Sequence, residues 1–458
     1  MQTNSIAGGA DLGRDAIGPL LRKLAVPAIL AQIVNLLYNL VDRMYIGHIK
    51  DIGPDALTGV GVCMPVIMAI SAFAALVSMG GAPRASIMMG RGDHEQAENI
   101  LGNCTTLLTI IAVLLTLIVS VFGQSILMAF GASENTIGYA WEYMQIYAIG
   151  TIFVQLALGL NAFINAQGFA RIGMITVVIG AVCNIVLDPI FMFIFGMGVR
   201  GAALATILSQ AVSCVWILRF LTSDKSHLRI RRKYLLLRPR IFLPAVALGL
   251  SPFIMQFTES VLNVCFNTSL QRYGGDIAVG AMTILSSVMQ FTMLPLQGLT
   301  QGAQPIISFN YGAGKTDRVK QTFWVLLRWA AVYAGAMWAL CMLAPQLLIS
   351  VFTDSAELSE FTRWAMRVYM AASCIFSVQL ACQQTFIALG NSKTSAFLAL
   401  LRKVLLLIPF IYLLPQLIDN QVLAVFLAEP VADVIAVSVT ASLFAREYRR
   451  LDRKTART

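Results

Sequence analysis

The chain of 458 residues is 58% hydrophobic and only 12% charged, and its mean hydropathy is +0.75. A soluble domain carries about 25% charged residues, so the composition excludes an ordinary water-soluble protein. The net charge of +10 is typical of a membrane protein with basic cytoplasmic loops, and nucleic-acid binding is the weaker interpretation. The eight cysteines form no CxxC pair and no Cys/His cluster, so neither zinc nor a disulfide framework is indicated.

Apolar stretches recur along the whole chain, each long enough to cross a bilayer as a helix of about 20 residues. They occupy residues 19–47, 56–83, 97–122, 135–167, 173–195, 201–222, 241–270, 277–310, 321–353, 359–389, 394–417 and 421–445. Glycine, proline and charged residues separate them. The pattern predicts an all-α polytopic membrane protein with twelve transmembrane helices.

Most of the 33 Lys and Arg residues fall in the segments on one side of these twelve spans, including both ends of the chain. Basic residues are retained on the cytoplasmic side, so we expect a cell-membrane protein with both termini in the cytoplasm. Residues 227–237 are basic and partly amphipathic. This pattern favours a helix lying on the anionic inner leaflet, in contact with membrane lipids.

The two halves of the chain repeat each other. Pro83 and Pro305 are separated by 222 residues, and so are Gly92 and Gly314. Six spans per half give both halves the same orientation, so the predicted repeat is parallel and has its pseudo-two-fold axis along the membrane normal. We therefore expect two six-helix lobes, residues 1–222 and residues 241–458 with a basic tail, joined by a cytoplasmic linker at 223–240. Two such lobes can rock around a central cavity, an arrangement that serves transport.

A polar stripe runs along the first predicted span. Asn35, Asn39 and Asp42 recur on one helical face, with Tyr38 one turn before the aspartate. Polar residues within a span usually face the interior of the bundle. Pro27 removes a backbone hydrogen bond earlier in this span and can let it bend.

The fifth span carries an amide and an acid on one face, Asn184 and Asp188, directly before Pro189. An acid near the bilayer centre costs at least about 2.5–3.5 kcal/mol, so a binding role is expected. The predicted topology puts Asp188 at a depth similar to that of Asp42. Together with Thr206 of the sixth span, these residues form a candidate cation site.

The same residues have plainer interpretations. Asp42 could pair with the adjacent Arg43 at the membrane surface, and Thr206 could be a packing residue. Asn161 of the fourth span is a secondary polar candidate. An alkali cation needs oxygen ligands and a proton needs only a carboxylate, so the sequence leaves H⁺ and Na⁺ open. No other cofactor, and no structural or catalytic metal, is expected.

The second half lacks this acid pair, because Asn267 stands 225 residues after Asp42. Glu259 of the seventh span could instead attract a cationic apolar compound, in a cavity with an adaptable methionine-rich wall. The other candidate cavity residues are Gln256, Asn263, Met289, Phe291, Met293, Gln379 and Gln383. Glu429 and Asp433 of the last span share a face, and they could simply pair with Arg402 or Lys403.

Several motifs together resemble a known family. They are Tyr38-Asn39-Leu40-Val41-Asp42, Ala56-Leu57-Thr58-Gly59-Val60-Gly61 with Pro65, Gly90-Arg91-Gly92-Asp93, Asn184 to Asp188, and Gly201-Ala202-Ala203-Leu204-Ala205-Thr206. Over essentially its whole length the chain resembles the multidrug and toxic compound extrusion (MATE) transporters. Within them it is most similar to the branch of MepA-like and DNA-damage-inducible pumps.

The resemblance implies export of organic compounds coupled to inward H⁺ or Na⁺. It implies a cation site at Asp42, Asn184, Asp188 and Thr206 in the N-terminal lobe, and a bendable first span at Pro27. Another branch of the family uses a C-terminal site with a glutamate, matched here by Glu259, and an aspartate in span ten. This sequence has Leu380, Ala381 and glutamines there instead.

We therefore expect a multidrug antiporter that is not an enzyme, works as a monomer on drug-like small molecules and binds no nucleic acid. A lipid-linked oligosaccharide flippase of the same superfamily is the alternative. It should carry basic residues for pyrophosphate within its cavity, and the first-half spans are almost free of them. A membrane-embedded transferase would need clustered histidines or acids, whereas the three histidines are scattered, and a receptor or scaffold would have no use for buried paired acids.

Overall fold

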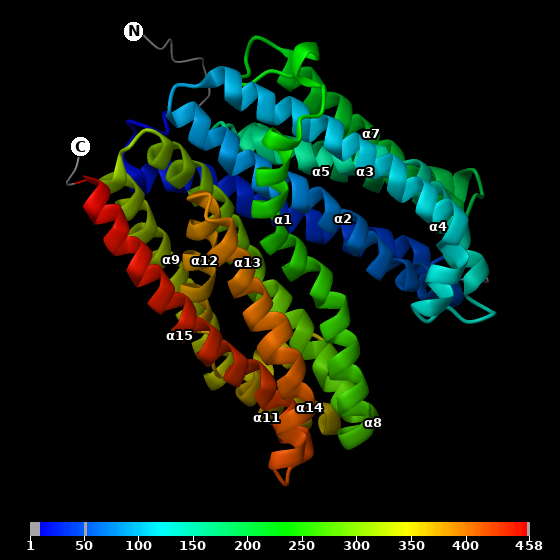
Figure 1. The fold of residues 1–458 in the computed structure, drawn as a ribbon. Helices are drawn as coiled ribbons and strands as arrows, with labels where there is room; N and C mark the ends of the chain where they lie inside the picture. Colours follow the sequence, from blue (N-terminus) through cyan, green and yellow to red (C-terminus); the bar gives the residue numbers. More distant parts are fainter. Residues whose placement is uncertain (1–9, 50–52, 456–458) are drawn as a thin grey trace.

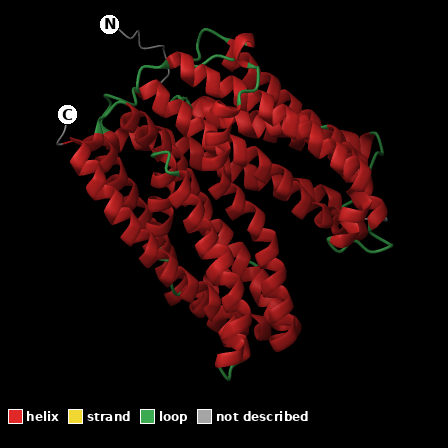
Figure 2. Cartoon of the chain, in the orientation of Figure 1, coloured by secondary structure: helices red, strands yellow, loops and turns green. Residues whose placement is uncertain are grey.

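The computed structural model describes residues 10–49 and 53–455, and every regular element within them is a helix (Figure 2). The first half contains α1 (Ile17–Gly47), α2 (Gly53–Gly90), α3 (His94–Ala129), α4 (Ile137–Ile149), α5 (Thr151–Ala166), α6 (Ala170–Pro189) and α7 (Val199–Thr222). The second half contains α8 (Pro239–Gly312), α9 (Thr316–Leu343), α10 (Pro345–Ile349), α11 (Ala356–Tyr369), α12 (Phe376–Ala388), α13 (Ser392–Leu400), α14 (Ile408–Leu417) and α15 (Gln421–Thr455). The predicted all-α fold is confirmed.

Nine helices in the described residues are long and apolar enough to cross a membrane, and α4 with α5, bent by 59°, makes a tenth. The 74 residues of α8 would extend for about 110 Å as one straight helix, far more than a bilayer needs. Gly275 interrupts it with a positive φ of 64°, so α8 is two antiparallel arms. This turn lies between the predicted spans 241–270 and 277–310. The predicted span 359–389 is also divided, into α11 and α12.

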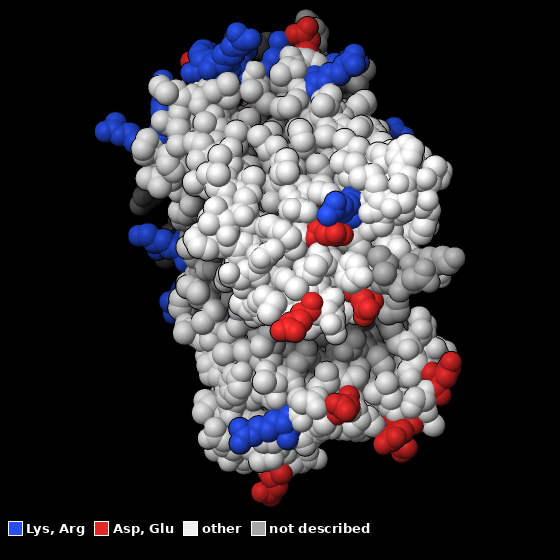
Figure 3. Space-filling model, turned by 90° about the vertical axis from the view of Figure 1, so that its right-hand side faces the viewer, with Lys and Arg blue, Asp and Glu red and all other residues white. Residues whose placement is uncertain are grey.

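The helices form two lobes arranged as a V (Figure 1). Helices α1 to α7 make one lobe and α8 to α15 the other. The lobes meet near the end of the molecule that carries both termini, and they diverge toward the opposite end. On the face drawn in Figure 3, Lys and Arg gather at the end with the termini. The shared end for the two termini agrees with an even number of spans.

Glycines let the lobes touch backbone to backbone where they meet. A Cβ atom added to Gly90 of α2 would lie 2.0 Å from the carbonyl oxygen of Phe309, and one added to Gly312 would lie 2.0 Å from that of Ile87. Gly312 and Phe309 follow Gly90 and Ile87 by the same 222 residues, so the two contacts are two-fold equivalents. The repeat seen in the sequence is therefore a symmetry of the lobe interface.

Each lobe contains a π-helical segment in its fifth span. In the first lobe, residues Ile190–Ile194 follow Pro189, and the amide of Phe195 donates to the carbonyl of Ile190 over 2.9 Å. In the second lobe the segment is Leu401–Leu407, shortly before Pro409. Such segments are frequent at functional sites because they rotate the side chains that follow. Both segments here lie beside clusters of buried polar residues.

The linker at 223–240 corrects one expectation. Residues 223–238, which precede α8, contain no amphipathic surface helix, only a single 3₁₀ turn at Arg232–Tyr234. Leu228 is fully buried and its amide donates to Gln167 over 2.9 Å, while Arg231 forms a 2.6 Å ion pair with Glu98 of α3. The basic linker therefore docks on acids and amides of the first lobe instead of forming a helix for the bilayer surface.

Candidate functional site

The structure brings the four predicted site residues of the first lobe together from three helices. Asp42 on α1 is 6% exposed, and Asn184 and Asp188 on α6 are 2% and 0% exposed. The Asn184 amide donates to Asp188 Oδ1 over 3.1 Å and reaches Thr206 Oγ1 of α7 at 3.4 Å. The carboxyl groups of Asp42 and Asp188 face each other within reach of a hydrogen bond.

Several oxygens of this cluster are unsatisfied. Within the described part of the chain, Asp42 Oδ1, Asn184 Oδ1 and Asp188 Oδ2 are buried and accept no hydrogen bond. Buried polar atoms nearly always have a partner, so three acceptors without one in the same place can accept hydrogen bonds from water or coordinate a cation. Two carboxylates with amide and hydroxyl oxygens suit a proton or a hard alkali cation. No group of three His, Cys, Asp or Glu side chains able to hold a metal ion occurs in residues 10–49 and 53–455.

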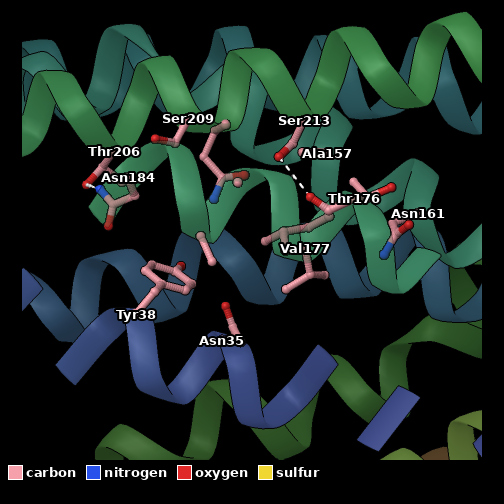
Figure 4. A pocket seen from close by; sticks show the side chains of 14 residues that line it. Asn35, Tyr38, Ala157, Asn161, Thr176, Val177, Asn184, Thr206, Ser209 and Ser213 are labelled. Atoms are coloured by element: carbon pink, nitrogen blue, oxygen red, sulfur yellow. Dashed lines mark hydrogen bonds between the residues drawn. The ribbon is translucent and has the colours of Figure 1, made fainter. Parts of the chain in front are cut away.

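A small pocket of about 60 Å³ adjoins the acids, between α1, α5, α6 and α7 (Figure 4). Asn35 and Tyr38 project into it from α1 and face Asn184 and Thr206. A water molecule occupies about 30 Å³ in the liquid, so this pocket suits water or an ion and is too small for a drug. By its volume, the pocket can hold water or an ion but not a drug-sized substrate.

Asn161 also lines this pocket and donates its amide to the carbonyl of Gly173 over 3.3 Å. Four other polar residues line the pocket and were not predicted from the sequence, namely Thr176, Ser209, Gln210 and Ser213. Three of these follow Thr206 on α7 within two helical turns. Their spacing was visible in the sequence as a polar extension of the small-residue helix.

Two predicted residues of the first span have other positions. Asn39 does not line the pocket, because its amide donates to the carbonyl of Asn35 on the same helix over 2.6 Å. Arg43 is exposed while Asp42 is buried, and no ion pair joins them among the described residues. Pro27 lies within α1, which continues through it. The geometry thus favours Asp188, not Arg43, as the neighbour of Asp42.

A second cavity, of about 700 Å³, lies between the lobes. It is lined mainly by the second lobe, with Ile67, Met68, Ser71 and Met79 contributed by α2. Of the candidate cavity residues, the structure brings five to its wall: Gln256, Glu259, Asn263, Met289 and Met293. Its size is in the range of drug-binding pockets.

Three of the candidate cavity residues do not line this cavity. Gln379 and Gln383 are buried between α12 and α8, where Gln379 donates to Gln383 over 3.2 Å and Gln383 donates to Ser251 over 3.0 Å. Phe291 is 53% exposed and lies outside the cavity wall. The adjacent Gln384 lines it instead. The helical span is interrupted between α11 and α12, so the helical spacing before the interruption does not predict which side of α12 faces the cavity.

A network of ion pairs forms the polar end of the large cavity. Arg402 binds Glu429 at 2.8 Å and Asp433 at 2.6 Å, as the plainer interpretation of these two acids predicted. Lys403 binds Glu259 at 2.7 Å. The π-helical segment Leu401–Leu407 turns these two successive basic residues toward the acids of α8 and α15. Glu259 therefore already has a cationic partner within the protein.

A family model agrees with this architecture. The MatE model matches residues 27–190 and again residues 252–413, once in each lobe. The chain belongs to the MatE family. The two matches begin at Pro27 and Pro252, which are corresponding positions of the repeat.

Curated relatives of this MatE protein include the multidrug export protein MepA of Staphylococcus haemolyticus, 22% identical over 421 residues and covering 92% of both chains. MepA of Staphylococcus aureus strain N315 is 22% identical over 426 residues and covers 91% of both. Among solved structures, a MATE protein crystallised in the bent conformation has a TM-score of 0.91 with 22% identity and full coverage of both chains. A MOP-superfamily transporter from Pyrococcus furiosus, described as having a binding pocket of reverse polarity, has a TM-score of 0.89 with 22% identity and 99% coverage of both. These structures share the fold.

Proposed function

We propose that this MatE protein is a multidrug efflux antiporter of the cell membrane. It exports amphipathic organic compounds that carry a positive charge, in exchange for inward H⁺ or Na⁺. The observation that carries the proposal is the buried pair Asp42 and Asp188 with its three unsatisfied oxygens. Membership of the MatE family and similarity to proteins described as multidrug export proteins support the substrate class.

The two cavities support separate positions for ion and substrate. The pocket beside the acids admits water or an ion, whereas the cavity of about 700 Å³ between the lobes admits a drug-sized compound. A cation entering between Asp42 and Asp188 changes how α1 packs on α6. Pro27 gives α1 a point at which it can bend in response.

Alternating access follows from the V-shaped arrangement. The lobes pack closely at the end with the termini, where Gly90 and Gly312 approach the opposite backbones, and they diverge at the other end (Figure 1). The basic residues at the closed end support a cytoplasmic position for both termini and the linker. In that orientation the present structure is open to the outside. Rocking about the glycine contacts opens the cytoplasmic side.

A lipid-linked oligosaccharide flippase is less consistent with the site. It needs unpaired basic groups that bind a pyrophosphate. The basic residues that line the large cavity are Arg402 and Lys403, and acids already neutralise both. The MatE multidrug interpretation therefore stands ahead of it.

Transport by the full-length protein in proteoliposomes tests the proposal. An imposed pH gradient or an imposed Na⁺ gradient is applied separately, and export of two dyes, ethidium and rhodamine B, is followed by fluorescence. We expect one of the gradients to drive dye export. Asp42→Asn and Asp188→Asn should each remove gradient-driven export because each deletes an oxygen acceptor and a charge from the ion site.

Asp354→Asn is the matched control, since Asp354 is an exposed aspartate between α10 and α11. It should transport as the unmodified protein does. Full gradient-driven export by both site variants would refute the assignment of the ion site. Export of neither dye under either gradient would refute the antiporter function itself.

A further inference from the structure

The charges in the wall of the large cavity carry a more specific inference, which rests on the proposed export function. The charged residues lining this cavity are Glu259, Arg402, Lys403 and Glu429. Two are acidic and two are basic, and Asp433 behind the wall is the third acid of the network; each of these three acids is bound to Arg402 or Lys403. A cavity built only to attract cations would instead carry an excess of free carboxylates.

The two basic residues differ in how firmly they are held. Arg402 has a 5% exposed side chain, binds both Glu429 and Asp433, and lies 4.3 Å over the ring of Phe376. A guanidinium held on several sides is part of the framework. Lys403 has a 9% exposed side chain and a 2.7 Å ion pair with Glu259. Its flexible stem lets the ammonium move without disturbing the backbone.

Glu259 forms the accessible half of this second pair. Its side chain is 52% exposed, and the carboxylate belongs to the cavity wall. A positively charged group of a substrate can therefore reach it. A purely cationic substrate, however, competes with Lys403 and leaves that ammonium without its partner in a largely buried position, which is strongly unfavourable.

We propose that this cavity selects zwitterionic amphiphiles, whose cationic group binds Glu259 and whose carboxylate binds Lys403. Such a compound inserts into the ion pair and exchanges its own two charges for the intramolecular contact. Neither protein charge is left unpaired. The substrate class is thus a cation that also carries an acid, rather than a simple cation.

The rest of the wall fits the remaining parts of such a molecule. Methionines line one region, including Met255, Met282, Met289 and Met293, and can adapt to different apolar bodies. Amide side chains near Glu259, those of Gln256 and Asn263, can donate hydrogen bonds to substrate oxygens. The charged end then fixes orientation, and the methionine region tolerates variation.

One pair of dyes isolates the carboxylate. Rhodamine B is a free acid with a cationic ring system, and its ethyl ester keeps the ring system but has no carboxylate. Binding of each dye to the purified full-length protein in lipid nanodiscs is measured by fluorescence polarisation, with protein-free nanodiscs as background. We expect the free acid to bind about tenfold more tightly than the ester, because only the acid compensates Lys403. Equal or tighter binding of the ester would overturn the proposal.

Variants of Lys403 then test whether the preference for the free acid depends on the ion pair of Glu259 and Lys403. Lys403→Met should weaken binding of the free acid about tenfold and leave binding of the ester unchanged or improved, since Glu259 becomes free for cations. Lys403→Arg should retain the preference for the free acid. Lys393→Met is the matched control: it removes an exposed lysine of α13, the helix directly before the π-helical segment with Lys403, outside the cavity, and should bind as the unmodified protein does.

The possible failures are distinguishable. A folded Lys403→Met protein that keeps the preference for the free acid overturns the role of this pair. If that variant does not fold, the unmodified protein and Lys403→Arg still decide through the two dyes. Preferential binding and gradient-driven export of the ester would leave the antiporter function standing and refute the zwitterion selectivity.

Discussion

In the N-terminal lobe, the buried carboxyl groups of Asp42 and Asp188 face each other, and one oxygen of each lacks a partner within the described residues. In the C-terminal lobe, the buried acids Glu429 and Asp433 both bind Arg402. The two clusters lie in corresponding parts of one repeated fold. In the described residues no basic side chain forms an ion pair with the first two acids, whereas the second pair of acids has Arg402.

This difference shows how a repeated architecture can divide two tasks. A site that must take up and release an ion has to remain incomplete between the two events. A wall that must remain in place around different organic compounds benefits from charges that are already paired. The lobes share glycine contacts, broken helices and π-helical segments, so the framework is symmetric and the chemistry is not.

Removal of the Arg402 charge from its cluster with Glu429 and Asp433 should have the largest effect on the stability of the protein. Arg402→Met leaves Glu429 and Asp433 buried without a counter-charge, and we expect a loss of about 3–5 kcal/mol in stability. The loss of stability is measured by heating the detergent-solubilised protein and quantifying the remaining folded fraction by size-exclusion chromatography. Combining this change with Glu429→Gln and Asp433→Asn should restore most of the stability. Arg272→Met, at an exposed position near the turn of α8, should be neutral; an equally small effect of Arg402→Met would contradict the comparison.

The symmetric part of the interface should respond symmetrically. Gly90→Ala and Gly312→Ala each place a methyl group against an opposing carbonyl, so each should destabilise the closed end by about 1–3 kcal/mol. Spin labels on α2 and the second arm of α8, followed by pulsed electron paramagnetic resonance, should report similar widening of that end in both variants. Gly61→Ala is the control, because a Cβ there has open space. A large effect in only one variant would show that the two symmetry-related glycine contacts contribute unequally to the stability of the interface.

The N-terminal acid cluster followed from the sequence because each of its elements is local. The i to i+4 spacing of Asn184 and Asp188 fixes their common face. The alternating direction of successive spans placed Asp42 of the first span at a depth similar to that of Asp188 of the fifth. Thr206 was predicted from its position on the small-residue helix of the sixth span. The repeat was equally readable, since proline and glycine positions recur at a constant separation, and the break at Gly275 lies between two predicted spans.

The C-terminal cluster was only partly predictable. Glu259 and Lys403 are 144 residues apart, and their contact depends on a π-helical segment that sequence periodicity does not indicate. The rotation of α12, which buries Gln379 and Gln383, depends on the break after α11. The linker was misassigned because its basic residues suit either an anionic membrane or the acids Glu95 and Glu98. In each case a tertiary partner decided between two locally acceptable structures.

Loss of a charge from the Asp42 and Asp188 pair should not lower the stability of the protein, in contrast to loss of the Arg402 charge. Asp188→Asn removes a buried carboxyl without leaving a buried cation unpaired, so we expect stability to be unchanged or to rise by about 1 kcal/mol. Transport should nevertheless be lost. The same thermal unfolding measurement provides the test, with Asp354→Asn as the exposed control. A loss of stability as large as that of Arg402→Met would show that Asp188 has an intramolecular counter-charge after all.

The smallest expected effect concerns the docked linker and depends on pH. His227 stacks on Phe169 with ring centroids 5.1 Å apart, and burial, followed by the neighbouring His94, holds its pKa below the usual value. A histidine whose pKa is lowered on folding stabilises the docked state above its unfolded pKa of about 6.5, and this contribution is lost as the pH falls. Hydrogen–deuterium exchange, corrected for its intrinsic pH dependence, should therefore show faster exchange of residues 223–240 on acidification below that value. His227→Phe keeps the stacking and should remove this pH dependence, whereas an unchanged dependence in that variant would assign the effect to another group.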